Sequence, residues 1–66
     1  MKKIRFEELE VGKCYTQDER DLIFVKMRND YIATFHLVDY DEETGAGFET
    51  DEEIELTQSE CYFRVY

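Results

Sequence analysis

The amino-acid sequence predicts an all-β domain, and two observations support this prediction. Apolar residues alternate with polar ones over most of the 66 residues, which is the two-residue period of half-buried strands. β-branched and aromatic residues, which favour strands, are abundant in the same stretches. A chain this short buries one thin core. We therefore expect a single domain over residues 1–66, with short strands joined by tight turns.

The first half of the chain predicts two strands. Residues 13–16 form the first one, directly after Gly12, and the segment before this glycine is expected to be a short turn or a single helical turn. The polar cluster at residues 17–20 ends the first strand, and residues 22–27 form the second. Residues 28–30 form a tight turn, because asparagine and aspartate tolerate the left-handed backbone that hairpin turns need.

The second half predicts three further strands. Residues 31–40 form the third, and apolar residues on both faces of its hairpin with the second predict a strongly bent ribbon. Residues 41–47 form a loop in which two glycines supply positive φ angles. Residues 48–56 form a fourth, mostly polar strand. Residues 57–60 make one helical turn before the fifth strand at residues 61–66.

Closure of this sheet is expected because five strands in so short a chain would otherwise leave two unpaired edges, so the terminal strands should pair. Residues 6–15, FEELEVGKCY, resemble the opening segment of SH3-like barrels of the Tudor and KOW kind. This resemblance implies a small five-stranded SH3-like barrel with a short helical turn near the N-terminus and another before the last strand. Such barrels are mostly binding modules. The size, the acidity and the lack of proline also resemble small accessory proteins of bacteriophages that inhibit host factors.

The charge of the chain is concentrated in one half. The net charge is −9, yet residues 29–63 hold eleven acids and no lysine or arginine. This balance argues against direct binding of nucleic acid or of an anionic membrane, and it favours a basic protein surface as the partner. We expect the partner to contact a ridge formed by Asp39, Tyr40, Asp41, Glu42, Glu43, Glu49, Asp51, Glu52, Glu53 and Glu55.

Two functional interpretations of the ridge come from different classes, beside a third in which it serves solubility alone. In the first, its carboxylates imitate phosphates and occupy the cleft of a nucleic-acid-binding host protein, which is inhibited by occlusion without chemistry. In the alternative, a Tudor- or KOW-like module reads a basic or methylated peptide. Tyr40, Tyr62 and Tyr66, near Asp39 or Asp41, would then form an aromatic cage.

Metal, cofactor and catalytic sites are not expected. Residues 39–43 begin like a calcium loop, but the glycine and the bidentate glutamate of such a loop are missing at the required positions. Cys14, Cys61 and His36 are too few for a structural zinc site. A chain of this size has little room for an enclosed substrate cavity, so we expect a protein that is not an enzyme.

The location of the protein is expected to be cytoplasmic, because no apolar stretch approaches the length of a membrane span and the first residues turn acidic before a signal segment could form. Cys14 and Cys61 are then thiols. Pairing of the terminal strands would allow a bridge between them, which a reducing compartment disfavours. The phenylalanines, Phe48 included, are expected to be internal, and the tyrosines half-buried or at strand ends.

Overall fold

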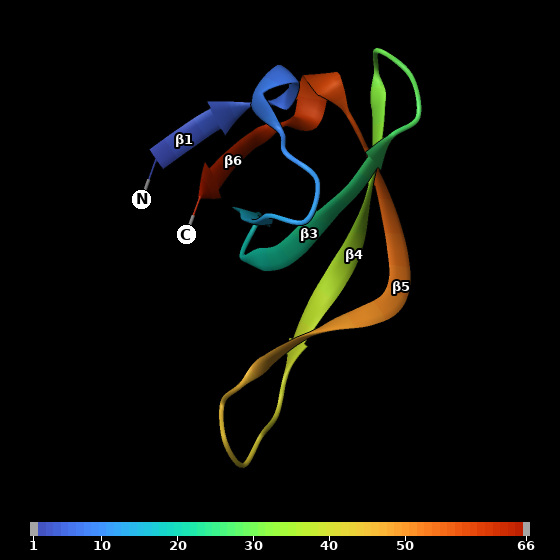
Figure 1. Ribbon diagram of the computed structural model, residues 1–66. Helices are drawn as coiled ribbons and strands as arrows, with labels where there is room; N and C mark the ends of the chain where they lie inside the picture. The colour runs from blue at the N-terminus through green and yellow to red at the C-terminus, as the bar shows by residue number, and fades with distance from the viewer. Residues whose placement is uncertain (1, 66) are drawn as a thin grey trace.

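The fold was analysed in a computed structural model that describes residues 2–65 of the chain, and these form an all-β structure with one open sheet of six antiparallel strands (Figure 1). The strand order in the sheet is β1-β6-β2-β3-β4-β5. In chain order the elements are β1 (Lys2–Arg5), η1 (Phe6–Glu8), β2 (Cys14–Gln17), β3 (Arg20–Met27), β4 (Ile32–Tyr40), β5 (Gly47–Thr57), η2 (Gln58–Glu60) and β6 (Tyr62–Val65), where η marks a single 3₁₀ turn.

The five predicted strands correspond to β2 through β6, and both predicted one-turn segments are present as η1 and η2. The expected contact between the terminal strands is confirmed, since Tyr15 of β2 lies opposite Val65 of β6. The turn before β4 is also confirmed. The Asn29 side chain shapes it by accepting hydrogen bonds from the backbone amides of Tyr31 (2.7 Å) and Ile32 (3.0 Å).

The sheet nevertheless differs from a five-stranded closed barrel. The additional strand β1 pairs with β6, with Ile4 opposite Phe63, where a turn was predicted. β1 was not predicted because it has only four residues and only Ile4 among them is buried, so the sequence shows no alternation of polarity there. In the sheet of residues 2–65, β1 and β5 are the unpaired edges. Both edges carry charged side chains, with three basic residues on β1 and five carboxylates on β5.

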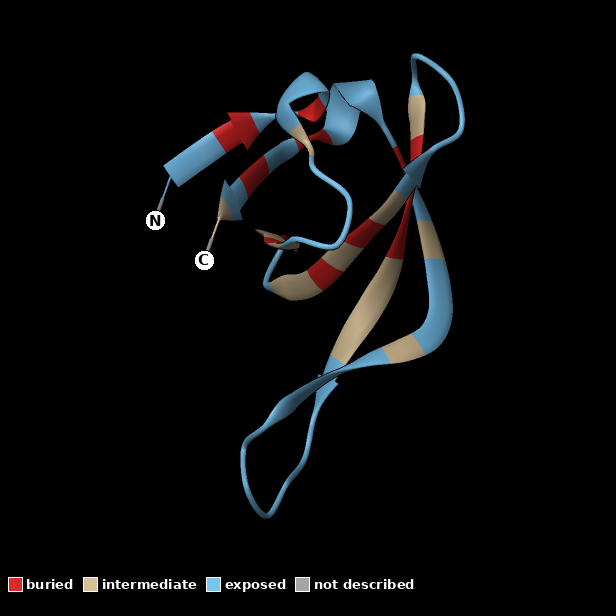
Figure 2. Cartoon of the chain, viewed as in Figure 1, coloured by how far each residue is buried: buried red, intermediate tan, exposed pale blue. Residues whose placement is uncertain are grey.

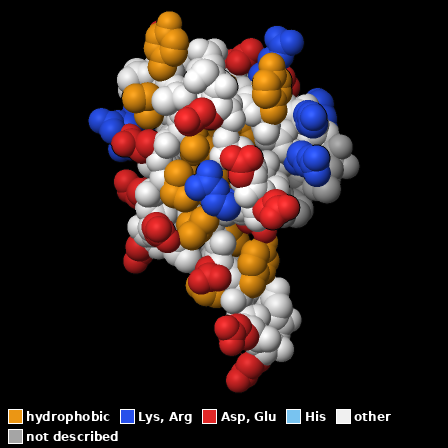
Figure 3. All heavy atoms as spheres, turned by 180° about the vertical axis from the view of Figure 1, so that it is seen from behind, with side chains coloured by type: hydrophobic (Ala, Val, Ile, Leu, Met, Phe, Trp, Pro, Cys, Tyr) orange, Lys and Arg blue, Asp and Glu red, His pale blue; other side chains and the backbone are white. Residues whose placement is uncertain are grey.

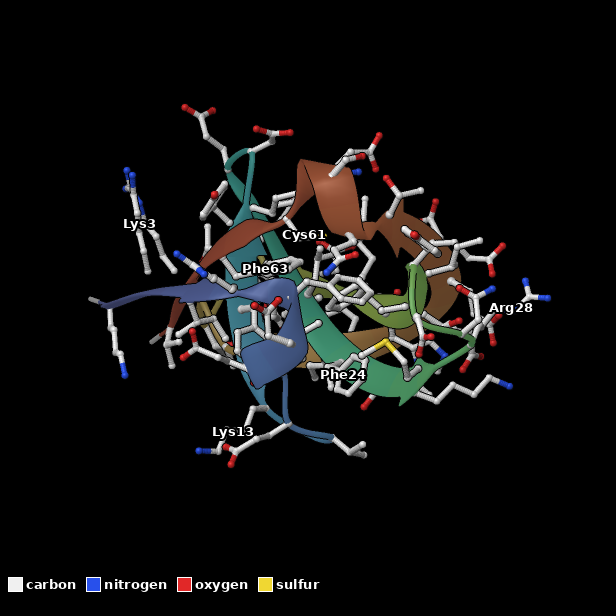
Figure 4. The ribbon with its side chains drawn as sticks, turned by 90° about the horizontal axis from the view of Figure 1, so that it is seen from above. Lys3, Lys13, Phe24, Arg28, Cys61 and Phe63 are labelled. Carbon is white, nitrogen blue, oxygen red and sulfur yellow. The ribbon has the colours of Figure 1, made fainter. Side chains whose placement is uncertain are left out.

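The core lies inside the curl of the sheet (Figure 2), and five of its ten buried residues are aromatic. The Phe35 ring contacts those of Phe24 and Phe63 at centroid distances of 5.6 and 5.2 Å, and Tyr15 lies 5.7 Å from Phe63. Figure 4 shows Phe24 and Phe63 inside this curl, whereas Lys3 and Arg28 point away on opposite sides. Tyr15 is thus a core residue, not a half-buried one, and its hydroxyl accepts a hydrogen bond from the backbone of Glu10 (2.8 Å).

The β4–β5 hairpin continues beyond the core, and its outer part, residues 38–49, is called the arm below (Figure 1). At its base the register changes, because His36 lies opposite Glu53 whereas Val38 lies opposite Glu49. The resulting bulge bends β5 strongly. Thr50 fixes the bulge, since its hydroxyl donates a hydrogen bond to the backbone carbonyl of Leu37 (2.7 Å). The bend expected from the two apolar faces concerned the β3–β4 hairpin, where the register shifts between Phe24 and Lys26. The bend of β5 was not predicted.

Candidate functional site

All ten residues of the predicted ridge are exposed and lie on the β4–β5 hairpin. Asp39 and Tyr40 end β4, Asp41, Glu42 and Glu43 lie in the connecting loop, and Glu49, Asp51, Glu52, Glu53 and Glu55 lie on β5. Figure 3 shows acidic side chains along the narrow lower projection, with hydrophobic side chains at its base. The acids surround the ribbon, because successive residues of a strand point to opposite faces.

Within residues 2–65, three of the nine ridge carboxylates are paired with basic side chains. Glu55 forms an ion pair with Arg28. Glu49 and Glu53 flank His36, with Oε2 of Glu49 2.5 Å from Nδ1 and Oε1 of Glu53 3.6 Å from Nε2. The bulge places these two glutamates on either side of one ring. Their hydrogen bonds, that of Glu49 above all, raise the pKa of His36.

The other six carboxylates, within residues 2–65, form no ion pair. They are Asp39, Asp41, Glu42, Glu43, Asp51 and Glu52. One of them also shapes the loop, since Oδ1 of Asp41 accepts hydrogen bonds from the backbone amides of Glu43 (2.8 Å) and Thr44 (3.4 Å). Residues 38–52 of the hairpin, which run from the arm into the bulge, therefore carry six carboxylates that pair with no cation of residues 2–65.

An apolar groove opens beside the arm, where its base meets the outer face of β2 and β3. Its volume is about 280 Å³, and its lining consists of Cys14, Ile23, Val38, Tyr40, Gly47, Phe48 and Glu49. Sequence reasoning missed this groove because Phe48 was assigned to the interior, whereas it is 51% exposed. The apolar residues on the second face of β3 and β4 were the signal for it.

Tyr40 forms one wall of the groove and is held from two directions. Its hydroxyl donates a hydrogen bond to Asp21 of β3. Its ring lies over Gly47, where a Cβ atom would approach Cε1 of Tyr40 to 3.0 Å. Gly47 is therefore required for space, and the expectation that both loop glycines supply positive φ holds only for Gly45, at 74°.

The two described tyrosines of the predicted cage lie apart. Tyr62 begins β6, beside Lys3 and Arg64 in a different hollow of the surface, and β2 and β3 separate β6 from β4 in the sheet. Tyr40 and Tyr62 therefore do not form one cage. Tyr66 lies outside the described residues, so its position relative to Tyr40 stays a prediction.

Cys14 and Cys61 are both free thiols. Tyr15 pairs with Val65, so Cys14 lies beyond the far end of β6 from Cys61, and the intervening four residues extend roughly 13 Å at the usual strand rise. A disulfide needs Cα atoms within about 7 Å, which excludes the bridge in this structure. Burial raises the pKa of Cys61 to about 11 and, with Asp21 as a lesser cause, raises that of Cys14.

Among residues 2–65, no three His, Cys, Asp or Glu side chains are grouped as metal ligands. The two helical segments of this range have three residues each, so neither is long enough to cross a membrane. Compared with known protein families, curated proteins and solved structures, the chain shows no significant match.

Proposed function

We propose that the protein is a small acidic binding protein that inhibits a nucleic-acid-binding host protein, as phage-encoded inhibitors do. The arm would enter the basic cleft of the target and exclude the nucleic acid, without chemistry. One observation carries this proposal: six carboxylates that form no ion pair within residues 2–65 are gathered on a hairpin and its bulge, projecting from the body. A surface that served solubility alone would intersperse both signs of charge.

The spacing of these carboxylates supports a phosphate-like role. Asp51 and Glu52 are consecutive, so these two carboxylates follow one another at about 3.4 Å along the strand, on opposite faces. One strand of B-DNA also carries a charge about every 3.4 Å along the helix axis. The unneutralised field would accelerate association with a basic cleft by a factor of about 10 to 1,000.

A second candidate is a Tudor- or KOW-like module that reads a basic or methylated peptide through aromatic side chains. The exposure of Tyr40 and Phe48 beside one groove favours it, because a cation can stack on such rings. Of the tyrosines first named for this role, Tyr40 alone would contribute among the described residues. We place either function in the cytoplasm, where both cysteines would stay reduced.

Capture from a bacterial lysate tests the leading proposal when two variants of equal net charge are compared. In the arm variant, two acids of the arm and two of the bulge at its base become amides: Asp41→Asn, Glu42→Gln, Asp51→Asn and Glu52→Gln. In the control variant the same change is made away from the arm: Glu7→Gln, Glu8→Gln, Asp18→Asn and Glu19→Gln. The Asp41→Asn substitution keeps the side-chain oxygen that the loop amides need.

We expect the native chain and the control variant to retain a partner that elutes with salt, and the arm variant to associate with it at least about tenfold more slowly. The captured partner should bind labelled DNA or RNA and release it when the native chain is added. Equal loss of partner binding in both variants would show that binding depends on net charge alone and not on the position of the acids. A partner that keeps its nucleic acid would contradict inhibition by occlusion.

A further inference from the structure

The groove at the base of the arm is small and open, and its size suits one side chain. Its volume of about 280 Å³ lies below the range of about 300–1,000 Å³ found for small-molecule pockets. Five of its seven lining residues, Cys14, Ile23, Val38, Tyr40 and Phe48, present apolar surface. Phe48 and Tyr40 are 51% and 47% exposed, so water covers apolar surface there that a partner could exclude.

The groove is formed before any partner arrives. Tyr40 is positioned by its hydrogen bond to Asp21 and by the missing side chain of Gly47. Ile23 and Cys14 pair across β2 and β3, so the floor is part of the sheet. A preformed site loses less conformational freedom on binding than one that must be assembled.

The charges around the groove define what it would accept. Glu49 lines it, Asp39 precedes its tyrosine wall, and Asp21 holds that wall, while no lysine or arginine belongs to its lining. A second copy of the chain would bring another −9 against this rim. Charge complementarity therefore favours an apolar residue flanked by lysine or arginine.

We infer that the groove binds one leucine- or phenylalanine-sized side chain of a basic segment of the partner, while the arm binds the cations on either side. This inference rests on the proposed function for the basic character of the partner. It adds the source of specificity, because buried apolar anchors dominate binding energy whereas exposed charges mainly set association rate. A DNA-like field alone would not distinguish one basic cleft from another.

Two seven-residue peptides test the inference by NMR titration at physiological salt. Both carry three lysine or arginine residues on each side of the centre, and the central residue is leucine in one and serine in the other. We expect the leucine peptide to bind about tenfold more tightly, as burial of one such side chain implies. This preference should fall to about twofold or less in a Phe48→Ser variant. Tyr31→Ser is the matched control, because Tyr31 is 69% exposed and lies outside the groove, and it should keep the preference.

Cys14 provides a second readout, since it lines the groove whereas Cys61 is buried. Alkylation by iodoacetamide, mapped by mass spectrometry, should slow at Cys14 with the leucine peptide and not with the serine peptide. Equal, salt-sensitive binding of both peptides would overturn the groove inference and leave electrostatic capture standing. Binding of neither would overturn both. A dimer in sedimentation that Phe48→Ser dissociates would also overturn the inference, because a second copy would then occupy the groove.

Discussion

Replacing Gly47 with alanine tests whether the wall of the groove is held as the structure shows. The added Cβ would lie 3.0 Å from Cε1 of Tyr40, 3.4 Å from its Cδ1 and 3.5 Å from Cγ1 of Val38. The ring must then shift by a few tenths of an ångström. It cannot do so freely, because its hydroxyl is bonded to Asp21. We expect this hydrogen bond to weaken or break.

Two opposing effects set the magnitude. A hydrogen bond to a charged acceptor stabilises by about 1.5–3 kcal/mol, and the lower value, about 1.5 kcal/mol, applies to a half-exposed ring. Alanine restricts the unfolded chain and returns about 0.4–1 kcal/mol, because the backbone of residue 47 has no positive φ and accepts alanine without strain. The net expectation is a destabilisation of the arm by about 0.5–1 kcal/mol. In a Tyr40→Ala background there is no ring to displace, so only the gain from restricting the unfolded chain remains. The effects of Gly47→Ala and Tyr40→Ala should therefore be coupled by about 1.5 kcal/mol.

Amide hydrogen exchange measures the change in local stability of the arm. The probe is the Asp41 amide, which donates a hydrogen bond to the Ala46 carbonyl (2.9 Å). With Gly47→Ala, exchange should accelerate about two- to fivefold in the native background and slow by a similar factor in the Tyr40→Ala background. Gly45→Ala is the matched control: φ is 74° and nothing lies near its Cβ, so its effect should be equal in both backgrounds. An equal effect of Gly47→Ala in both would refute the steric reasoning.

Two further predictions concern the bulge and the first hairpin. Because Glu49 and Glu53 raise the pKa of His36, the stabilisation that its protonation provides is complete below the unfolded-state value near 6.5 and is lost as the pH rises through the higher folded-state value. In urea unfolding, the free energy of unfolding of the native chain should therefore fall relative to that of His36→Gln as the pH rises over that interval. A difference between the two free energies that does not change with pH would contradict the pairing. Asp18 and Glu19 both adopt positive φ, 48° and 63°, in a two-residue turn that favours the sequence Asp-Gly. Glu19→Gly should therefore raise the free energy of unfolding by up to about 1 kcal/mol, which corresponds to about 4–8 °C in Tm. Glu19→Ala keeps the unfavourable backbone and should give no such rise in thermal unfolding, so an equal rise would contradict the explanation.

The strands were predictable where one face alternates in polarity. Leu22 and Phe24 on β3, and Ala33 and Phe35 on β4, are all buried, as a two-residue period predicts, and Thr34 between the last two is buried as well. The turn between β3 and β4 was predictable because Asn29 favours the backbone conformation of a tight turn. By contrast, the turn before β3 lacks glycine and asparagine, so no local signal indicated a two-residue hairpin there.

The remaining features depend on tertiary contacts. β1 becomes a strand because β6 offers it a partner, with Ile4 opposite Phe63. Phe48 resembles a core residue in its alternating pattern, but the bulge carries its part of β5 beyond the body. The acidic residues of the hairpin were predicted from composition alone. The groove beside them was not, because it arises from residues of several strands and from a register change that no local pattern specifies.

The shapes of the two unpaired edges, β1 and β5, leave the acidic hairpin available to a partner. Basic β1 and acidic β5 lie at opposite ends of the sheet order, so copies of the chain could attract one another edge to edge. β1 has only four residues, and the bulge opposite Leu37 bends β5, so neither edge offers a long straight ladder. A partner that binds through side chains, as the arm and groove would require, needs no such ladder. The bulge that joins Glu49 and Glu53 to His36 thus also leaves the acidic edge too bent for a long ladder with β1 of another copy.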